Sequence, residues 1–122
     1  MLAVGIDFIE IARIRAAVAR YGDRFCARVY TLHELADCAG ESHRLAARFA
    51  AKEAVSKALG VGIHHRDGVG WREIEVIADA RGQPIVQLSG QAAQRAAQLN
   101  LNRFAVSLSH SRELAIAMVV AE

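Results

Sequence analysis

The two ends of the chain alternate, residue by residue, between large apolar side chains and small or polar ones. In residues 2–8 the large side chains occupy the even positions, while Asp7 shares the other side with Gly5. Residues 103–110 and 114–121 alternate in the same way. A period of two is typical of strands with two different faces, so these segments predict three β-strands. The small residues of the last segment, mostly alanine, suit a closely packed helix.

The middle of the chain has the longer period of helices. Apolar residues from Ile11 to Tyr21 recur at helical spacing directly after the first strand. Thr31 and Glu34 form a capping box that opens a short helix, which Gly40 can close. The remaining expected elements are a loop at 60–70, strands at 71–78 and 85–88, and a helix at 91–99. This order predicts an α+β fold in which an antiparallel sheet packs on a long central helix.

The central helix, beginning near Ser42, has two contrasting halves. Its segment 48–60 reads R-F-A-A-K-E-A-V-S-K-A-L-G and ends at a glycine. The apolar half is almost all alanine, so a neighbouring element should pack very close to it. The charged half includes Phe49, one turn before Glu53, with Lys57 one turn further on. Such a face could hold a cation and an anionic ligand together, although an ordinary solvated Glu–Lys pair has the same spacing.

Composition limits the function classes. A chain of 122 residues that is 53% hydrophobic suits one globular domain covering residues 1–122. No apolar run approaches the ~18 residues of a membrane span, and Asp7 interrupts the N-terminal apolar stretch, so we expect neither a membrane segment nor a signal peptide. The net charge of +2 is too balanced to indicate nucleic acid. Cys26 and Cys38 fit no metal or disulfide pattern, which favours reduced thiols and a cytoplasmic protein.

Two acidic residues stand among apolar neighbours. Asp7 is the one acid of the first predicted strand, and burying its carboxylate requires a partner, either an arginine or a metal ion. Glu53 is the second such acid. Two carboxylates from separate elements suit Mg²⁺, which retains waters and is usually completed by substrate phosphates. Lys57, on the same helical face as Glu53, would then meet those phosphates.

Histidines occur at two places. His110 stands between serines in the segment S-L-S-H-S at 107–111, which raises the possibility of a nucleophile with its base. No G-x-S-x-G elbow surrounds it, so a hydrogen-bonding or phosphate-facing role is favoured. His64 and His65 lie with Asp67 in the glycine-rich loop without the ligand spacing of zinc, and we expect them at the surface.

Two blocks of the sequence resemble a known family. The segment G-I-D-F-I-E-I-A-R-I at 5–14 and the helical segment at 48–60 are similar to the two signatures of the holo-acyl-carrier-protein synthases, the small bacterial 4′-phosphopantetheinyl transferases. The S-L-S-H-S turn and the strand after it resemble the C-terminus of that family. The resemblance covers the whole chain, although segments 26–41 and 60–70 match no signature.

The resemblance implies a reaction and a set of site residues. Members transfer the phosphopantetheine arm of coenzyme A to a serine of apo-acyl carrier protein in fatty acid biosynthesis and release adenosine 3′,5′-bisphosphate. By resemblance, Asp7 and Glu53 hold Mg²⁺, Lys57 contacts the phosphates, and Arg48 and His110 contact coenzyme A. The serine proton would pass to a metal-bound water or to Glu53. Asp7, Glu53 and Lys57 are therefore the expected catalytic residues.

The resemblance also implies partners. Family members are homotrimers with active sites between subunits, so we expect a homotrimer here, as the high apolar content also suggests. Arg13, Arg20 and, if the first helix continues past Gly22, Arg24 form a stripe that we expect to dock the acidic acyl carrier protein. An ordinary solvated face would have the same appearance.

Two other functions remain open at this level. The same transfer could serve a carrier domain of a polyketide or peptide synthase. The chain could instead be a non-catalytic module that binds a nucleotide or an acidic protein, although such a module has no need for both Asp7 and Glu53.

Overall fold

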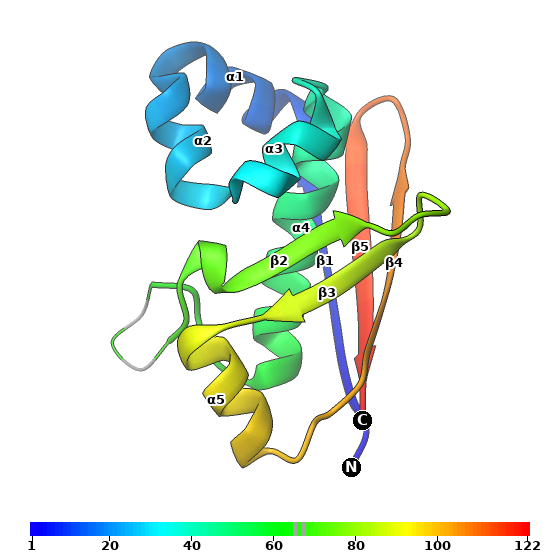
Figure 1. Ribbon diagram of the computed structural model, residues 1–122. Helices are drawn as coiled ribbons and strands as arrows, with labels where there is room; N and C mark the ends of the chain where they lie inside the picture. The colour runs from blue at the N-terminus through cyan, green and yellow to red at the C-terminus, as the bar shows by residue number, and fades with distance from the viewer. Residues whose placement is uncertain (65, 67) are drawn as a thin grey trace.

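The computed structural model describes residues 1–64, 66 and 68–122 (Figure 1). Its elements in chain order are β1 (Ala3–Glu10), α1 (Ile11–Tyr21), α2 (Asp23–Val29), α3 (Leu32–Cys38), α4 (Ser42–Leu59), the 3₁₀ turn η1 (Trp71–Glu73), β2 (Ile74–Ala78), β3 (Pro84–Leu88), α5 (Gly90–Gln98), β4 (Phe104–His110) and β5 (Leu114–Ala121). Of the residues predicted at the surface of the glycine-rich loop, His64 is exposed, while His65 and Asp67 lie outside the described residues.

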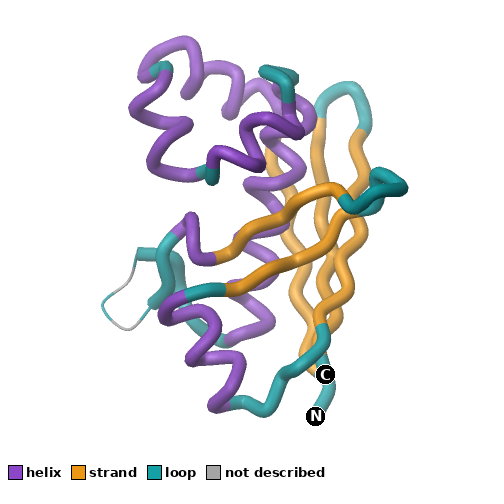
Figure 2. The backbone as a smooth tube through the Cα atoms, in the orientation of Figure 1, coloured by secondary structure: helices purple, strands orange, loops and turns teal. Residues whose placement is uncertain are grey.

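Helix α4 lies at the centre of this arrangement. The antiparallel sheet with strand order β1-β5-β4 runs alongside it, and the β2–β3 hairpin crosses it (Figure 1). Helices α1, α2 and α3 gather at one end of α4, and α5 and both termini lie toward the other end (Figure 2). Both sheets are antiparallel, which confirms the α+β fold predicted from the alternation. No helix within the described residues has the length and apolar character needed to cross a membrane.

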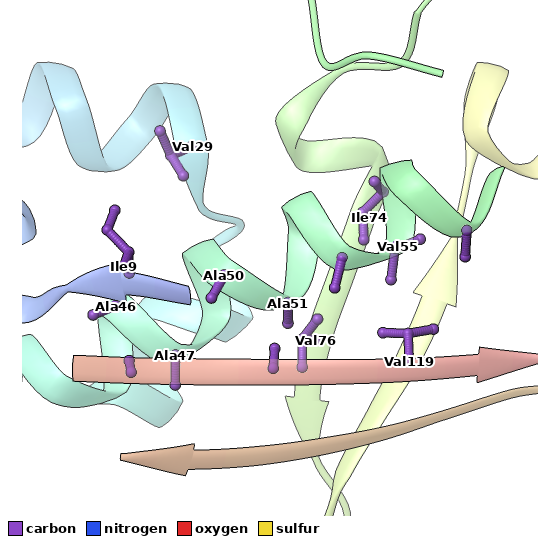
Figure 3. Close-up of a cluster of buried hydrophobic side chains, with 14 of the residues drawn as sticks. Ile9, Val29, Ala46, Ala47, Ala50, Ala51, Val55, Ile74, Val76 and Val119 are labelled. Carbon is purple, nitrogen blue, oxygen red and sulfur yellow. The ribbon is translucent and has the colours of Figure 1, made fainter. Parts of the chain in front are cut away.

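The alanine half of α4 packs against the sheet, as predicted. Ala50, Ala51 and Ala54 of α4 are fully buried, and so is Ala117 of β5. Figure 3 shows Ala50 and Ala51 in the same buried cluster as Val119 of β5. On β1 the approach is closer still, because a Cβ atom at Gly5 would overlap the carbonyl oxygen of Ala54. Glycine is therefore required at this position, and its absence of a side chain brings the backbones of β1 and α4 into contact.

The other face of the same sheet is exposed and apolar. The register pairs Ile6 with Met118 and Phe8 with Ile116, so large side chains lie side by side on this face. Phe8 is 65% exposed and Ile6 is 52% exposed. A contiguous apolar sheet face without cover is unusual for a monomeric protein and marks an interaction surface.

The first helix is shorter than the arginine stripe requires. It ends at Gly22, whose φ of 56° and ψ of −130° break the helical path, and Arg24 lies on the separate helix α2. The condition under which Arg24 would continue the stripe of Arg13 and Arg20, a first helix that extends past Gly22, is therefore not met. Glycine reaches this backbone conformation without steric cost, which explains why the helix breaks here.

The strand predicted at 71–78 is also shorter. Its first three residues form the turn η1, and only Ile74–Ala78 pair with β3. The reason is Glu73, whose carboxylate accepts the backbone N–H groups of Gly70 and Gln91. These bonds draw the chain into a turn, because a side chain that bonds nearby backbone competes with the ladder of a sheet.

Candidate active site

Asp7 from β1 meets Lys57 from α4. The Nζ atom of Lys57 donates to Oδ1 of Asp7 at 2.9 Å and to the carbonyl oxygen of Ile6 at 3.0 Å. The side-chain partner of Asp7 in this structure is thus a lysine, in place of the arginine that the sequence offered as the alternative to a metal ion. The close approach of β1 and α4 at Gly5 sets this distance.

Glu53 lies one turn before Lys57 and close enough to Asp7 to be influenced by its charge. Burial raises the pKa of the Glu53 carboxyl above its usual value, the negative charge of Asp7 raises it further, and Lys57 opposes the shift. The site therefore contains two carboxylates whose mutual repulsion one lysine only partly offsets. Additional positive charge at this place would be favourable.

The donor set suits a hard divalent cation. Asp7 and Glu53 supply carboxylate oxygens, which Mg²⁺ prefers, from two rigid elements. Within the described part of the chain no cluster of three or more His, Cys, Asp or Glu side chains forms a complete metal cage. A cation held by these two acids would therefore keep coordination positions for water and for a substrate, as Mg²⁺ sites that bind phosphates do.

Lys57 is positioned to serve an anion as well. Its side chain is 54% exposed, and an ammonium group has three donors, of which two are used by Asp7 and Ile6. The third donor can point outward to a phosphate oxygen. Nearby, Phe49 stacks on Trp71 with 4.6 Å between ring centroids, so an aromatic pair lies on the turn of α4 before Glu53.

Arg48 lies on a different side of α4. Nine positions separate it from Lys57, which places it about 180° around the helix and about 13 Å along its axis. Its Nε donates to the carbonyl oxygen of Val76 at 3.2 Å. It lines a cavity of about 700 Å³ between α3, α4, β4 and the β2–β3 turn, with Arg44 and Asp37. Within one copy of the chain, Arg48 does not join Asp7 and Glu53.

His110 marks a third place, at the end of β4. Its ring stacks on that of His43, at the start of α4, with 4.6 Å between centroids. The two histidines line a hollow of about 320 Å³ with Arg15 and Arg112. The sequence predicted the anion-facing character of His110 but gave no signal for His43, which becomes a neighbour only through the fold.

The expected docking arginines are all exposed. Arg13 and Arg20 lie on α1, and Arg24 lies on α2 beside a hollow of about 480 Å³ that Phe25 and Arg28 also line. The break at Gly22 therefore gives two adjoining basic surfaces in place of one continuous stripe.

A buried ion pair was missed by the sequence analysis. Lys52 and Glu34 are both fully buried, and Nζ of Lys52 donates to Oε1 of Glu34 at 2.7 Å. The capping box identified Glu34 as a helix-start residue, but the pattern gave no sign that the same carboxylate meets a lysine of α4. Lys52 fell within the charged half of the helix, where solvent exposure is the usual expectation.

Comparison with known proteins gives consistent results. The family model described as "4′-phosphopantetheinyl transferase superfamily" matches residues 3–119. The holo-[acyl-carrier-protein] synthase of Chloroflexus aurantiacus is 52% identical over 134 residues, covering 99% of this chain and 98% of that protein. The synthase of Herpetosiphon aurantiacus is 52% identical over 124 residues, with 98% of each chain covered. The crystal structure of the Helicobacter pylori synthase in complex with coenzyme A has a TM-score of 0.87, with 34% identity, 98% coverage of this chain and 99% of that one.

The fold and the family match define a small α+β enzyme of the phosphopantetheinyl transferase class. Within that class, the chain belongs to the family of the holo-[acyl-carrier-protein] synthases. The family resemblance predicted from segments 5–14 and 48–60 is thereby confirmed, and the match extends over almost the whole chain.

Proposed function

We propose that this enzyme transfers the 4′-phosphopantetheine group of coenzyme A to a serine of apo-acyl carrier protein, for fatty acid biosynthesis, in a Mg²⁺-dependent reaction. The observation that carries the proposal is the pair Asp7 and Glu53, held on separate elements, with Lys57 at 2.9 Å from Asp7. The names of the relatives and the coenzyme A in the Helicobacter pylori structure support the same substrates.

The chemistry requires the carrier serine to attack phosphorus. Its hydroxyl oxygen forms a bond to the phosphorus that bears the pantetheine, the pyrophosphate P–O bond breaks, and adenosine 3′,5′-bisphosphate leaves. Mg²⁺, when held by Asp7 and Glu53, would supply charge neutralisation for the phosphates. Lys57 binds a phosphate oxygen and orients the group under attack. Glu53, whose pKa is raised by burial, lies on the same face of α4 as Lys57 and can accept the proton of the serine hydroxyl.

The nucleotide half of coenzyme A is assigned to Arg48 and His110. Arg48 lines a cavity of about 700 Å³, and His110 stacks with His43 beside two arginines, so both places attract phosphate groups. Since these residues lie apart from Asp7 within one copy, we infer that a complete site combines the acid pair of one copy with Arg48 and His110 of another.

A homotrimer is the assembly that we propose for this purpose. The exposed apolar face of β1 and β5 supports association, because burying it between subunits stabilises the assembly by about 25 cal/mol for each Å² of apolar surface removed from water. Light scattering at micromolar concentration should give three times the chain mass. Ile6→Glu, which introduces a charge opposite Met118, should give monomers and strongly reduced transfer.

A matched control uses an exposed leucine elsewhere on the molecule. Leu32 is 83% exposed and lies on α3, away from the sheet face, so Leu32→Glu should leave the mass unchanged. A monomeric wild-type protein, or equal dissociation of both variants, would exclude this sheet face as the subunit interface.

Docking of the acyl carrier protein is assigned to Arg13, Arg20 and Arg24. Carrier proteins of this class are acidic around the helix that follows the modified serine, so exposed arginines on α1 and α2 complement them in charge. Arg13→Glu with Arg20→Glu should raise KM for the carrier about tenfold or more, leave KM for coenzyme A unchanged and reduce the salt dependence of association.

The matched control for docking is Arg103→Glu. Arg103 is exposed near the C-terminus, at the end of the molecule away from α1 (Figure 1). Its reversal should leave KM for the carrier unchanged. If reversal at Arg13 and Arg20 has no larger effect than reversal at Arg103, the carrier docks elsewhere.

The carrier class is tested by competition. Equal amounts of apo-carriers from fatty acid, polyketide and peptide synthesis are incubated with the enzyme, coenzyme A and Mg²⁺, and their intact masses are followed. The proposal predicts that the fatty acid carrier gains one phosphopantetheine first. Faster gain by another carrier would support the alternative substrate, and no gain on any would support the non-catalytic module.

A further inference from the structure

The outer edge of strand β2 in the β2–β3 hairpin faces α3 and α4. Strand β2 pairs with β3 along one side only, so the outward backbone groups of Ile74, Val76 and Ala78 need other partners. Side chains of α4 supply donors: Lys52 Nζ donates to the carbonyl oxygen of Ile74 at 2.5 Å, and Arg48 Nε donates to that of Val76 at 3.2 Å.

Side chains of α3 supply the acceptors. Oε2 of Glu34 accepts the N–H of Val76 at 2.8 Å, and Oδ2 of Asp37 accepts the N–H of Ala78 at 2.9 Å. Two cations and two anions thus take the place of a neighbouring strand along this edge. We call these four side chains the edge ladder: Glu34, Asp37, Arg48 and Lys52.

The four side chains of the edge ladder, each of which forms one rung by its hydrogen bond to β2, differ in burial. Glu34 and Lys52 are fully buried and Arg48 is 8% exposed, so these three fix the base of the hairpin within the protein interior. The side chain of Asp37 is 22% exposed and forms the last rung, nearest the hairpin turn. Gly82 and Pro84, beside that turn, line the same cavity as Arg48. The position of the turn therefore depends on the rung at Asp37.

We propose that Asp37 is a positioning residue for coenzyme A, acting through the hydrogen bond that it accepts from Ala78. This proposal rests on the proposed function, which places the nucleotide half of coenzyme A in the cavity beside Arg48. A carboxylate at the wall of a cavity for phosphates would repel them by direct contact, so its benefit must come from holding the hairpin. Without that bond the turn that bounds the cavity has a wider range of positions relative to α3 and α4, and binding must then restrict it.

Two substitutions at Asp37 separate positioning from charge. Asp37→Asn retains an oxygen that can accept the N–H of Ala78, whereas Asp37→Ala removes the acceptor. The positioning role predicts that Asp37→Ala raises the Kd and KM for coenzyme A about five- to tenfold, the equivalent of one hydrogen bond, while kcat stays within about twofold. Asp37→Asn should restore coenzyme A binding to near the wild-type value.

Other outcomes overturn the proposal. Tighter coenzyme A binding by both variants would mean that Asp37 acts only by its negative charge, and unchanged binding by both would mean that the rung has no role. Equally weakened coenzyme A binding in both variants would mean that the negative charge of Asp37 is required, either for contact with the ligand or for the local structure.

Amide hydrogen exchange tests the rung without any ligand. In Asp37→Ala the N–H of Ala78 should exchange at least about tenfold faster than in the wild type, while the N–H of Val76, held by Glu34, should keep its rate. Asp37→Asn should keep both rates. If the wild type binds no coenzyme A, the proposed function fails, and a wild-type exchange rate at Ala78 in Asp37→Ala separately refutes the rung.

Discussion

Glu53→Gln should abolish phosphopantetheine transfer and, at the same time, stabilise the metal-free protein. The amide keeps the shape of the carboxyl group but removes a charge needed to hold Mg²⁺. Charge stabilisation by a bound metal is worth several kcal/mol in a transition state, so we expect a loss of at least about 10²-fold in kcat/KM. Asp7→Asn should lose activity to a similar extent.

The effect on stability follows from the raised pKa of Glu53. The folded protein binds the Glu53 proton more tightly than the unfolded chain does. The wild type therefore loses stability as pH rises from the unfolded value of the carboxyl through its raised folded value. Glu53→Gln has no such loss, so in chelator its Tm at neutral pH should exceed that of the wild type, and the difference should vanish at acidic pH.

Scanning calorimetry over a pH series in chelator, with transfer assays at saturating Mg²⁺, measures both effects. Glu10→Gln is the matched control, because Glu10 is an exposed acid of β1, the strand that carries Asp7, and its substitution should change neither quantity. Near-normal turnover by Glu53→Gln would exclude Glu53 as a metal ligand.

Lys52→Met should be the most destabilising single change on α4. It removes the partner of Glu34 and leaves a carboxylate in a fully buried place. Breaking a buried ion pair in this way typically costs about 3–5 kcal/mol. It also deprives the carbonyl oxygens of Trp71 and Ile74 of their donor. Urea unfolding at neutral pH measures the loss directly.

A double substitution tests whether the cost arises from the pair. Glu34→Leu with Lys52→Met removes both charges, and its loss of stability should be smaller than the sum of the single losses, because no unpaired charge remains. Arg20→Met, on an exposed face of α1, should change stability by no more than about 0.5 kcal/mol. If Lys52→Met costs less than about 1 kcal/mol, the buried pair does not stabilise this fold.

Most of the fold was predictable because its elements follow local rules. The alternation in β1 and β5, the capping box at Thr31 and the αL glycine at Gly60 each determine their element from neighbouring residues. The alanine half of α4 likewise predicted a close neighbour, since only small side chains permit that packing. Gly5 showed the position of closest approach only after the fold placed it against Ala54.

The acid pair was predictable for a similar reason, whereas its surroundings were not. Glu53 and Lys57 are one helical turn apart, and Asp7 stands out in an apolar strand. The bond between Asp7 and Lys57 spans 50 positions, and that between Glu34 and Lys52 spans 18. Sequence periodicity shows which half of a helix is polar but not which of its polar residues are buried. It therefore grouped Lys52 with the charged residues that are usually exposed to solvent.

Transfer measured with and without Mg²⁺ decides whether Asp7 and Glu53 form a metal site that the reaction requires. The wild-type enzyme, coenzyme A and apo-acyl carrier protein are combined either with Mg²⁺ or with excess chelator. The intact mass of the carrier and the released nucleotide are then followed. With Mg²⁺, the carrier should gain one phosphopantetheine for each adenosine 3′,5′-bisphosphate released, and chelator should prevent both. Equal transfer in chelator would contradict the assignment of Asp7 and Glu53 as the metal site.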